Sequence, residues 1–190
     1  MKKLILPILL IMLFTTFGGA AAFAEKKAPD FKLKATDGKR YKLKDVLKGE
    51  KLVLIDFWAT WCTQCHKLLP HLKTMEEKYG DKGFKVVIVS IDSTNTINTV
   101  KSNMAGRGYK WLTLLDPTAS LKRKYQFKDI PYTVLISGEG ELIWTHAGYN
   151  PGQEKEIEAK IVEFLGIKTA EDTEEADEAE AADPEEESAE

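Results

Sequence analysis

The chain has 190 residues, of which 43% are hydrophobic and two are cysteines. This length suits one domain with extensions, and the apolar fraction is that of a globular protein. Two cysteines are too few for a disulfide-rich scaffold or for a metal site built from cysteine alone. The formal net charge of −3 hides segments of opposite charge. Residues 170–190 hold 12 acidic and no basic residues. Residues 25–169 keep 25 basic and 18 acidic residues, a net charge of +7.

The first 24 residues have the pattern of a secretory signal peptide. Lys2 and Lys3 precede an uncharged, mostly apolar run of 14 residues, and Ala22-Phe23-Ala24 offers small residues where a signal peptidase cuts. The run is shorter than the ~20 residues that a membrane-spanning helix needs. We therefore expect export, most simply to a periplasm, with cleavage after Ala24. An uncleaved N-terminal anchor is the alternative. Export would place both cysteines where a disulfide can persist.

The acidic segment 170–190 contains no aromatic residue and has nothing to bury. Such a segment repels itself, so the sequence predicts a solvated, disordered tail. A second interpretation is an electrostatic lure for a basic partner or a flap over its own domain.

Residues between the two ends begin with strand patterns. The segments 31–34 and 41–44 alternate apolar with cationic side chains around an Asp37-Gly38 turn, which predicts a half-exposed β-hairpin. The near-continuous apolar runs 52–58 and 84–91 are typical of strands buried on both faces.

Helices are expected between and after these strands. The predicted helices cover residues 62–79, 94–105, 119–125 and a segment that Pro151 opens. The remaining predicted strands cover 111–115, 132–136 and 141–145. This order predicts an α/β fold with a mixed central sheet flanked by helices.

Cys62 and Cys65 lie where a buried strand is followed by a helix. Residues three apart on a helix share a face, so the two sulfurs can approach closely enough for a disulfide. The free N–H groups and positive dipole end at a helix start favour the thiolate of Cys62, which is the attacking species in disulfide exchange. Cys65, one turn inside the helix, suits the role of resolving a mixed disulfide. The alternative is a purely structural disulfide between Cys62 and Cys65. The ring that such a disulfide closes spans only four residues, so it would constrain little of the chain.

Asp56 lies within an apolar strand, six residues before Cys62. A buried carboxylate is costly, so its pKa should rise. An acid with a raised pKa near Cys65 could take the proton of that thiol when it attacks a mixed disulfide. A solvated position at the strand end is the alternative.

The stretch 54–70, LIDFWATWCTQCHKLLP, resembles the active-site segment of thioredoxin-like proteins. Residues 27–167 as a whole resemble the exported TlpA/ResA-type thiol–disulfide oxidoreductases. The resemblance implies a thioredoxin-like fold with an N-terminal β-hairpin extension, and thioredoxin itself carries an aspartate at the place of Asp56. It also implies that Pro70 kinks the active-site helix and that Pro131 is a cis-proline facing the disulfide.

A cis bond at Pro131 would turn the Ile130 backbone toward the disulfide, where it could pair with an extended substrate segment. An ordinary trans turn is the alternative. Trp61, directly before Cys62, is expected to form an apolar docking surface, whereas Trp58 is expected in the core.

Relatives of this type mostly reduce their substrates, including apocytochrome c cysteines before haem attachment. Neither Thr63 nor Gln64 between the cysteines is charged, and both depart from the common proline-containing pairs. We expect a monomeric reductase of protein disulfides that a membrane-bound thiol donor recharges. It should need no cofactor or metal beyond the Cys62–Cys65 pair, and no nucleic-acid partner is expected.

Two other functions remain open. Residues 62–66 also spell CxxCH, the c-type haem motif, with His66 as one iron ligand and Met75 or Met104 as the other. The position of the motif in a βα unit favours a redox dithiol instead. A thiol peroxidase is the second alternative, but the threonine expected three residues before its cysteine is replaced by Ala59.

Overall fold

The structure is a computed structural model that describes residues 26–168. The expected signal peptide over 1–24 and the acidic tail over 170–190 therefore lie outside the described residues. Among the helices of the described part, none is both long and apolar enough to cross a membrane.

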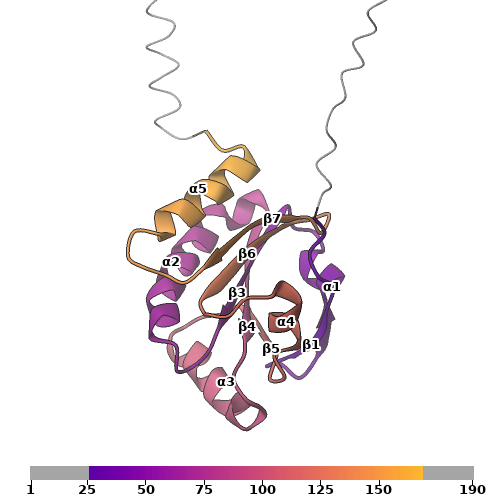
Figure 1. Ribbon diagram of the computed structural model, residues 1–190. Coiled ribbons are helices and arrows are strands. Elements are labelled where there is room, and N and C mark those ends of the chain that lie inside the picture. Colours follow the sequence, from indigo (N-terminus) through magenta and orange to yellow (C-terminus); the bar gives the residue numbers. More distant parts are fainter. Residues whose placement is uncertain (1–25, 169–190) are drawn as a thin grey trace, which may run out of the picture.

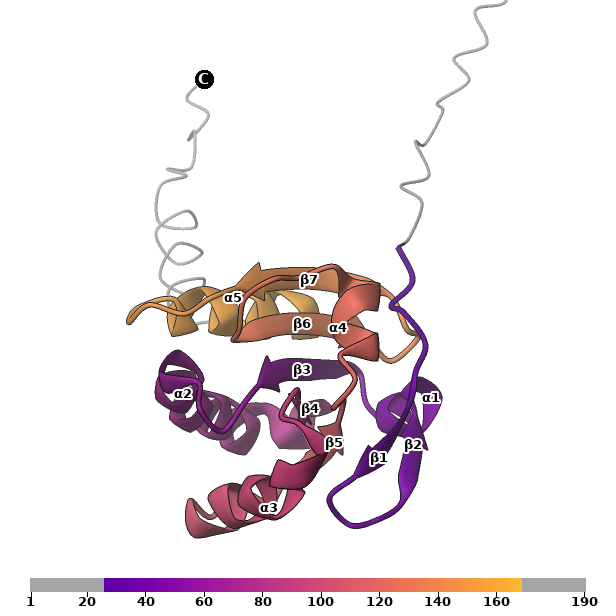
Figure 2. The ribbon, with the colours of Figure 1, turned by 60° about the horizontal axis from the view of Figure 1, so that its bottom comes forward.

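Within residues 26–168, seven strands form one mixed sheet in the order β2-β1-β5-β4-β3-β6-β7 (Figure 1). Strands β3, β4 and β5 are parallel to one another, and the other neighbouring pairs are antiparallel. The prediction of a mixed sheet with an N-terminal hairpin is confirmed, since the hairpin of β1 and β2 continues the sheet at one edge (Figure 2). The strands are β1 (Lys32–Ala35), β2 (Arg40–Lys42), β3 (Leu52–Trp58), β4 (Phe84–Ser90), β5 (Leu112–Leu115), β6 (Tyr132–Ser137) and β7 (Leu142–Ala147).

Helices cover both faces of the sheet. The buried side chains of α2, α3 and α5 join the core on one face, and those of α1 and α4 join the core on the other. The architecture is thus three layers, helix–sheet–helix, as the alternating pattern predicts. The helices are α1 (Leu43–Leu47), α2 (Thr63–Tyr79), α3 (Ile97–Gly106), α4 (Ser120–Tyr125) and α5 (Glu154–Leu165).

Strand β3 lies between β4 and β6, and all of its residues are buried. Successive side chains of a strand point to opposite faces. Leu54 and Trp58 belong to the core beneath α2, whereas Ile55 and Phe57 belong to the core beneath α1 and α4. The same alternation places Asp56 on the α2 face, the face on which the cysteines also lie.

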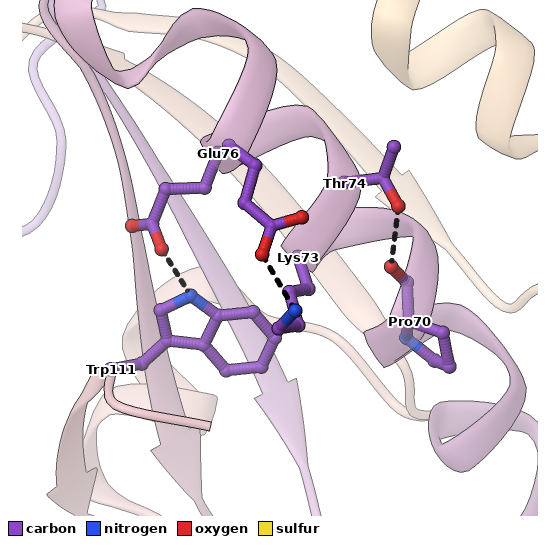
Figure 3. Close-up of polar contacts among 6 residues, drawn as sticks. Pro70, Lys73, Thr74, Glu76 and Trp111 are labelled. Carbon is purple, nitrogen blue, oxygen red and sulfur yellow. Dashed lines mark hydrogen bonds and ion pairs between the residues drawn. The ribbon is translucent and has the colours of Figure 1, made fainter. Parts of the chain in front are cut away.

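Glu76 fastens the second half of α2 to the sheet (Figure 3). Its carboxylate accepts a hydrogen bond from Trp111 Nε1 at 2.6 Å and another from the Val86 N–H at 2.8 Å. Pro70 lies inside the helix, and its carbonyl accepts a hydrogen bond from Thr74 Oγ1 at 3.2 Å (Figure 3). The two Glu76 hydrogen bonds hold the second half of α2 against β4 and against the segment that precedes β5.

The second hairpin strand is shorter than expected, because Leu43 begins helix α1 instead of continuing the strand. Leu43, Val46 and Leu47 have helical spacing and are buried. The Asp45 carboxylate accepts a hydrogen bond from the Lys42 N–H at 2.8 Å, which satisfies a donor at the helix start. The alternation over 41–44 is thus overridden by burial of one helix face.

Candidate active site

A disulfide joins Cys62 and Cys65 where β3 leads into α2, with an S–S distance of 2.00 Å and a Cα–Cα distance of 5.3 Å. Cys62 is the N-cap residue of α2, and its Sγ accepts a hydrogen bond from the Cys65 N–H at 3.1 Å. The first turn of the helix carries no acidic residue. In the reduced protein the positive helix end therefore favours a thiolate at position 62.

Exposure separates the two cysteines. Cys62 retains 6% of its surface, whereas Cys65 is 0% exposed. An incoming disulfide can therefore reach only the first sulfur without rearrangement of the helix. Trp61 is 68% exposed beside it, and Trp58 is fully buried, which confirms the predicted core position of Trp58.

The Ile130–Pro131 loop faces the first cysteine from the start of β6. The peptide bond between these residues is cis, as the resemblance implies. The Ile130 carbonyl oxygen lies 3.7 Å from Cys62 Sγ. The structure therefore brings Cys62, Trp61 and the Ile130–Pro131 loop together around the disulfide. What they bind there remains a prediction.

Asp56 is 0% exposed, so the alternative of a solvated aspartate is wrong. Its Oδ1 accepts a hydrogen bond from Thr133 Oγ1 at 2.9 Å, and its Oδ2 has no partner among the described residues. Burial raises the pKa of Asp56 to about 8, an effect that the Thr133 hydrogen bond partly opposes. The predicted direction of the shift is confirmed. The acid belongs to the same face of the sheet as Cys65, whose proton it is expected to take.

His66 is packed against the protein rather than available to a ligand. Its Nε2 donates a hydrogen bond to the Thr60 carbonyl at 2.9 Å, and its ring meets Trp58 edge-on at 5.6 Å between centroids. Its Nδ1 is buried without a partner in the described part of the chain. The methionines considered as distal ligands, Met75 and Met104, are core residues that are 3% and 5% exposed. Residues 26–168 contain no group of three or more side chains placed to hold a metal ion.

Asp92 is a residue of the site that the sequence analysis missed. It is 7% exposed and holds Thr60, accepting a hydrogen bond from Thr60 Oγ1 at 2.6 Å and one from the Thr60 N–H at 2.9 Å. Ser90 Oγ donates a third hydrogen bond to it at 2.8 Å. The sequence does carry a signal, since Asp92 follows a buried strand parallel to β3 and so reaches the same sheet edge as Cys62.

Replacing Asp92 by alanine is expected to lower the free energy of unfolding by about 2–3 kcal/mol, because a charge-assisted acceptor is lost and Thr60 is left with unpaired donors. Denaturation in urea measures the change. Asp92→Asn keeps one acceptor and should cost less, and the exposed Asp81→Ala is a matched control. A loss no larger than that of the control would contradict a clamping role for Asp92.

The mixed sheet and the disulfide at the start of α2 define a thioredoxin-like protein. Residues 23–161 match the Redoxin family model, and the chain belongs to this family. It is a thiol–disulfide oxidoreductase of the TlpA/ResA type. The thiol–disulfide oxidoreductase ResA of Bacillus anthracis is 33% identical over 135 residues, which cover 68% of this chain and 76% of ResA.

Two further relatives agree with this assignment. The thioredoxin-like protein YneN of Bacillus subtilis is 30% identical over 173 residues, which cover 85% of this chain and 98% of YneN. The crystal structure of a candidate thiol:disulfide interchange protein DsbE from Chlorobium tepidum superposes with a TM-score of 0.68. It is 33% identical, over 75% of this chain and 97% of that one. These relationships favour the redox dithiol over the haem and peroxidase alternatives.

Proposed function

We propose that this oxidoreductase works outside the cytoplasm as a reductase of protein disulfides, with Cys62 as nucleophile and Cys65 as resolving thiol. The observation that carries the proposal is the asymmetry of the pair. Cys62 lies at the helix start beside the exposed Trp61 and the Ile130 carbonyl, whereas Cys65 is completely buried. The sulfur of Cys62 is therefore placed to attack a substrate disulfide, and the sulfur of Cys65 is placed to attack the mixed disulfide that forms on Cys62.

The proposed cycle transfers two electrons from the dithiol to the substrate. The Cys62 thiolate attacks a substrate disulfide, forms a mixed disulfide and releases the first substrate sulfur as a thiolate, which takes a proton from water. The ionised form of Asp56, a minority near neutral pH because its pKa is raised to about 8, accepts the proton of Cys65, whose sulfur then attacks Cys62 Sγ. The second substrate sulfur leaves as a thiolate and takes a proton from water, Asp56 releases the proton it accepted, and the Cys62–Cys65 disulfide remains. No cofactor beyond the two thiols takes part.

The direction of exchange rests on the residues between the cysteines and on the relatives. Thr63 and Gln64 carry no charge that would stabilise the Cys62 thiolate further, as a strong oxidant needs. The proposal places the protein in a periplasm, because residues 1–24 have a signal-peptide pattern. In this proposal the protein acts as a monomer. A membrane-bound thiol donor would reduce its Cys62–Cys65 disulfide after each cycle. Cysteines of apocytochrome c are a substrate class that fits this setting.

Equilibration with glutathione redox buffers tests the direction. Potentials of this fold range from about −270 to about −120 mV, and we expect a value in the more reducing half of that range. The fraction of reduced protein at each buffer ratio, measured after acid quenching and alkylation, gives the potential. A value near −120 mV would instead identify an oxidant of substrate thiols.

A further inference from the structure

The exposed face of the β1–β2 hairpin carries a ladder of like charges. Lys32 stands directly opposite Lys42, and Lys34 stands directly opposite Arg40. All four side chains are exposed. None of them forms an ion pair within residues 26–168, where the ion pairs involve other lysines and a histidine. Like charges opposite one another destabilise a strand pair, so the arrangement has a cost that folding does not recover.

Three of these cations line a groove of about 360 Å³. Lys32, Lys34 and Arg40 form one side, and the segment after β5 together with Thr94 and Ile97 forms the rest. The buried acid of this lining, Asp116, already accepts hydrogen bonds from the first turn of α4, including one from Ser120 Oγ at 2.7 Å. Asp116 forms no ion pair with the three cations, and one carboxylate against three cations leaves this lining with a net positive charge for a ligand.

The groove lies at the same end of the sheet as the disulfide. The pairing registers join Trp58 to Ser90, Ser90 to Leu115, Leu115 to Lys34, and Lys34 to Arg40 in one continuous row. Trp58 and Leu115 belong to the core on the α2 face. Lys34 projects toward that face too, because Leu33 and Ala35 on either side of it are buried on the other. Neighbouring strands are about 4.8 Å apart, so three strand steps separate Lys34 from Trp58 by about 15 Å.

We infer that the groove beside the hairpin, through Lys32, Lys34 and Arg40, binds an acidic segment of the protein whose disulfide is exchanged at Cys62. This inference rests on the proposed function and adds a substrate class to it. An extended chain advances about 3.3 Å per residue. With the end of β3 taken as the position of the active site, Asp or Glu side chains about five residues from the substrate cysteine reach the groove while the substrate sulfur lies at Cys62.

Stopped-flow oxidation of the fully reduced, full-length protein by synthetic peptide disulfides tests the inference. Three peptides differ only in a four-residue segment five positions from the cysteine, which is all Glu, all Gln or all Lys. At low salt we expect the Glu peptide to react roughly tenfold faster than the Gln peptide and the Lys peptide to react more slowly. The preference should shrink toward equality in 0.5 M salt, because screening weakens contacts between exposed charges.

The double variant Lys34→Gln, Arg40→Gln should lose the preference for the Glu peptide and leave the rate with the Gln peptide unchanged. The control variant Lys82→Gln, Lys155→Gln removes the same net charge from exposed positions outside the groove and should keep the preference.

Equal rates for the three peptides would overturn the inference. The charges would then serve to keep an edge strand from pairing, or would be covered by the acidic residues 170–190. A failure of all three peptides to oxidise the protein would contradict the proposed function itself, and a Glu preference retained by the double variant would place the acidic subsite elsewhere.

Discussion

Replacing Cys62 by serine is expected to abolish disulfide exchange, with a loss of at least about 10³-fold in the rate of substrate reduction. A serine hydroxyl does not ionise near neutrality, and the remaining Cys65 is completely buried. Reduction of a peptide disulfide, followed by the release of free thiols, measures the loss. A residual rate within tenfold of the native rate would show that Cys65 can attack a substrate directly, against the proposed order of events.

Replacing Cys65 by serine should have a different effect, because attack by Cys62 is retained and resolution is lost. Mixed disulfides with substrates are expected to accumulate, and mass spectrometry of the trapped complexes would identify the substrates. The wild-type protein treated in parallel should trap few of them. Alkylation of the reduced protein provides an independent check, since Cys62 should react quickly below pH 8 and Cys65 slowly. Two equally slow thiols would contradict the assignment of a nucleophile.

The strand and helix pattern could be predicted because burial leaves a periodic signal in the sequence. The apolar run 52–58 indicates a strand buried on both faces, and β3 has these bounds. Helix α1 was missed because five residues are too few for a visible period, and its formation depends on contacts of Leu43 and Leu47 with the sheet core. Tertiary packing, which the local sequence does not display, decides such short elements.

In the candidate site, too, the sequence reveals some residues and hides others. The cysteines and Asp56 could be found because their residue types are unusual for a strand–helix junction and for a buried strand. Thr133, which donates to Asp56, and Asp92, which holds Thr60, lie far along the chain from their partners. Their roles follow from the register of β3 with β6 and with β4, and a single sequence shows the strands without their order.

Asp56→Asn is expected to stabilise the protein by about 4 kcal/mol at pH 7. Burial raises the pKa of Asp56 in the folded protein to about 8, against a reference value of 3.8. Between these values the folded state holds a proton that the unfolded state has released, so stability falls as the pH rises. The loss should approach 1.4 kcal/mol per pH unit in this window. Asparagine has no proton to lose and should remove this slope.

Urea denaturation from pH 4 to pH 9 measures both proteins, and the exposed Asp81→Asn is the control. The gain from Asp56→Asn should be small near pH 4 and should stop growing above about pH 8. The same substitution should slow the release of substrate from the mixed disulfide by 10²-fold or more, while the first attack by Cys62 keeps its rate. A more stable protein with a slower second step would mean that the buried acid is kept for catalysis at the expense of stability. A more stable protein with both steps unchanged would remove Asp56 from the proposed cycle and leave water to accept the proton of Cys65.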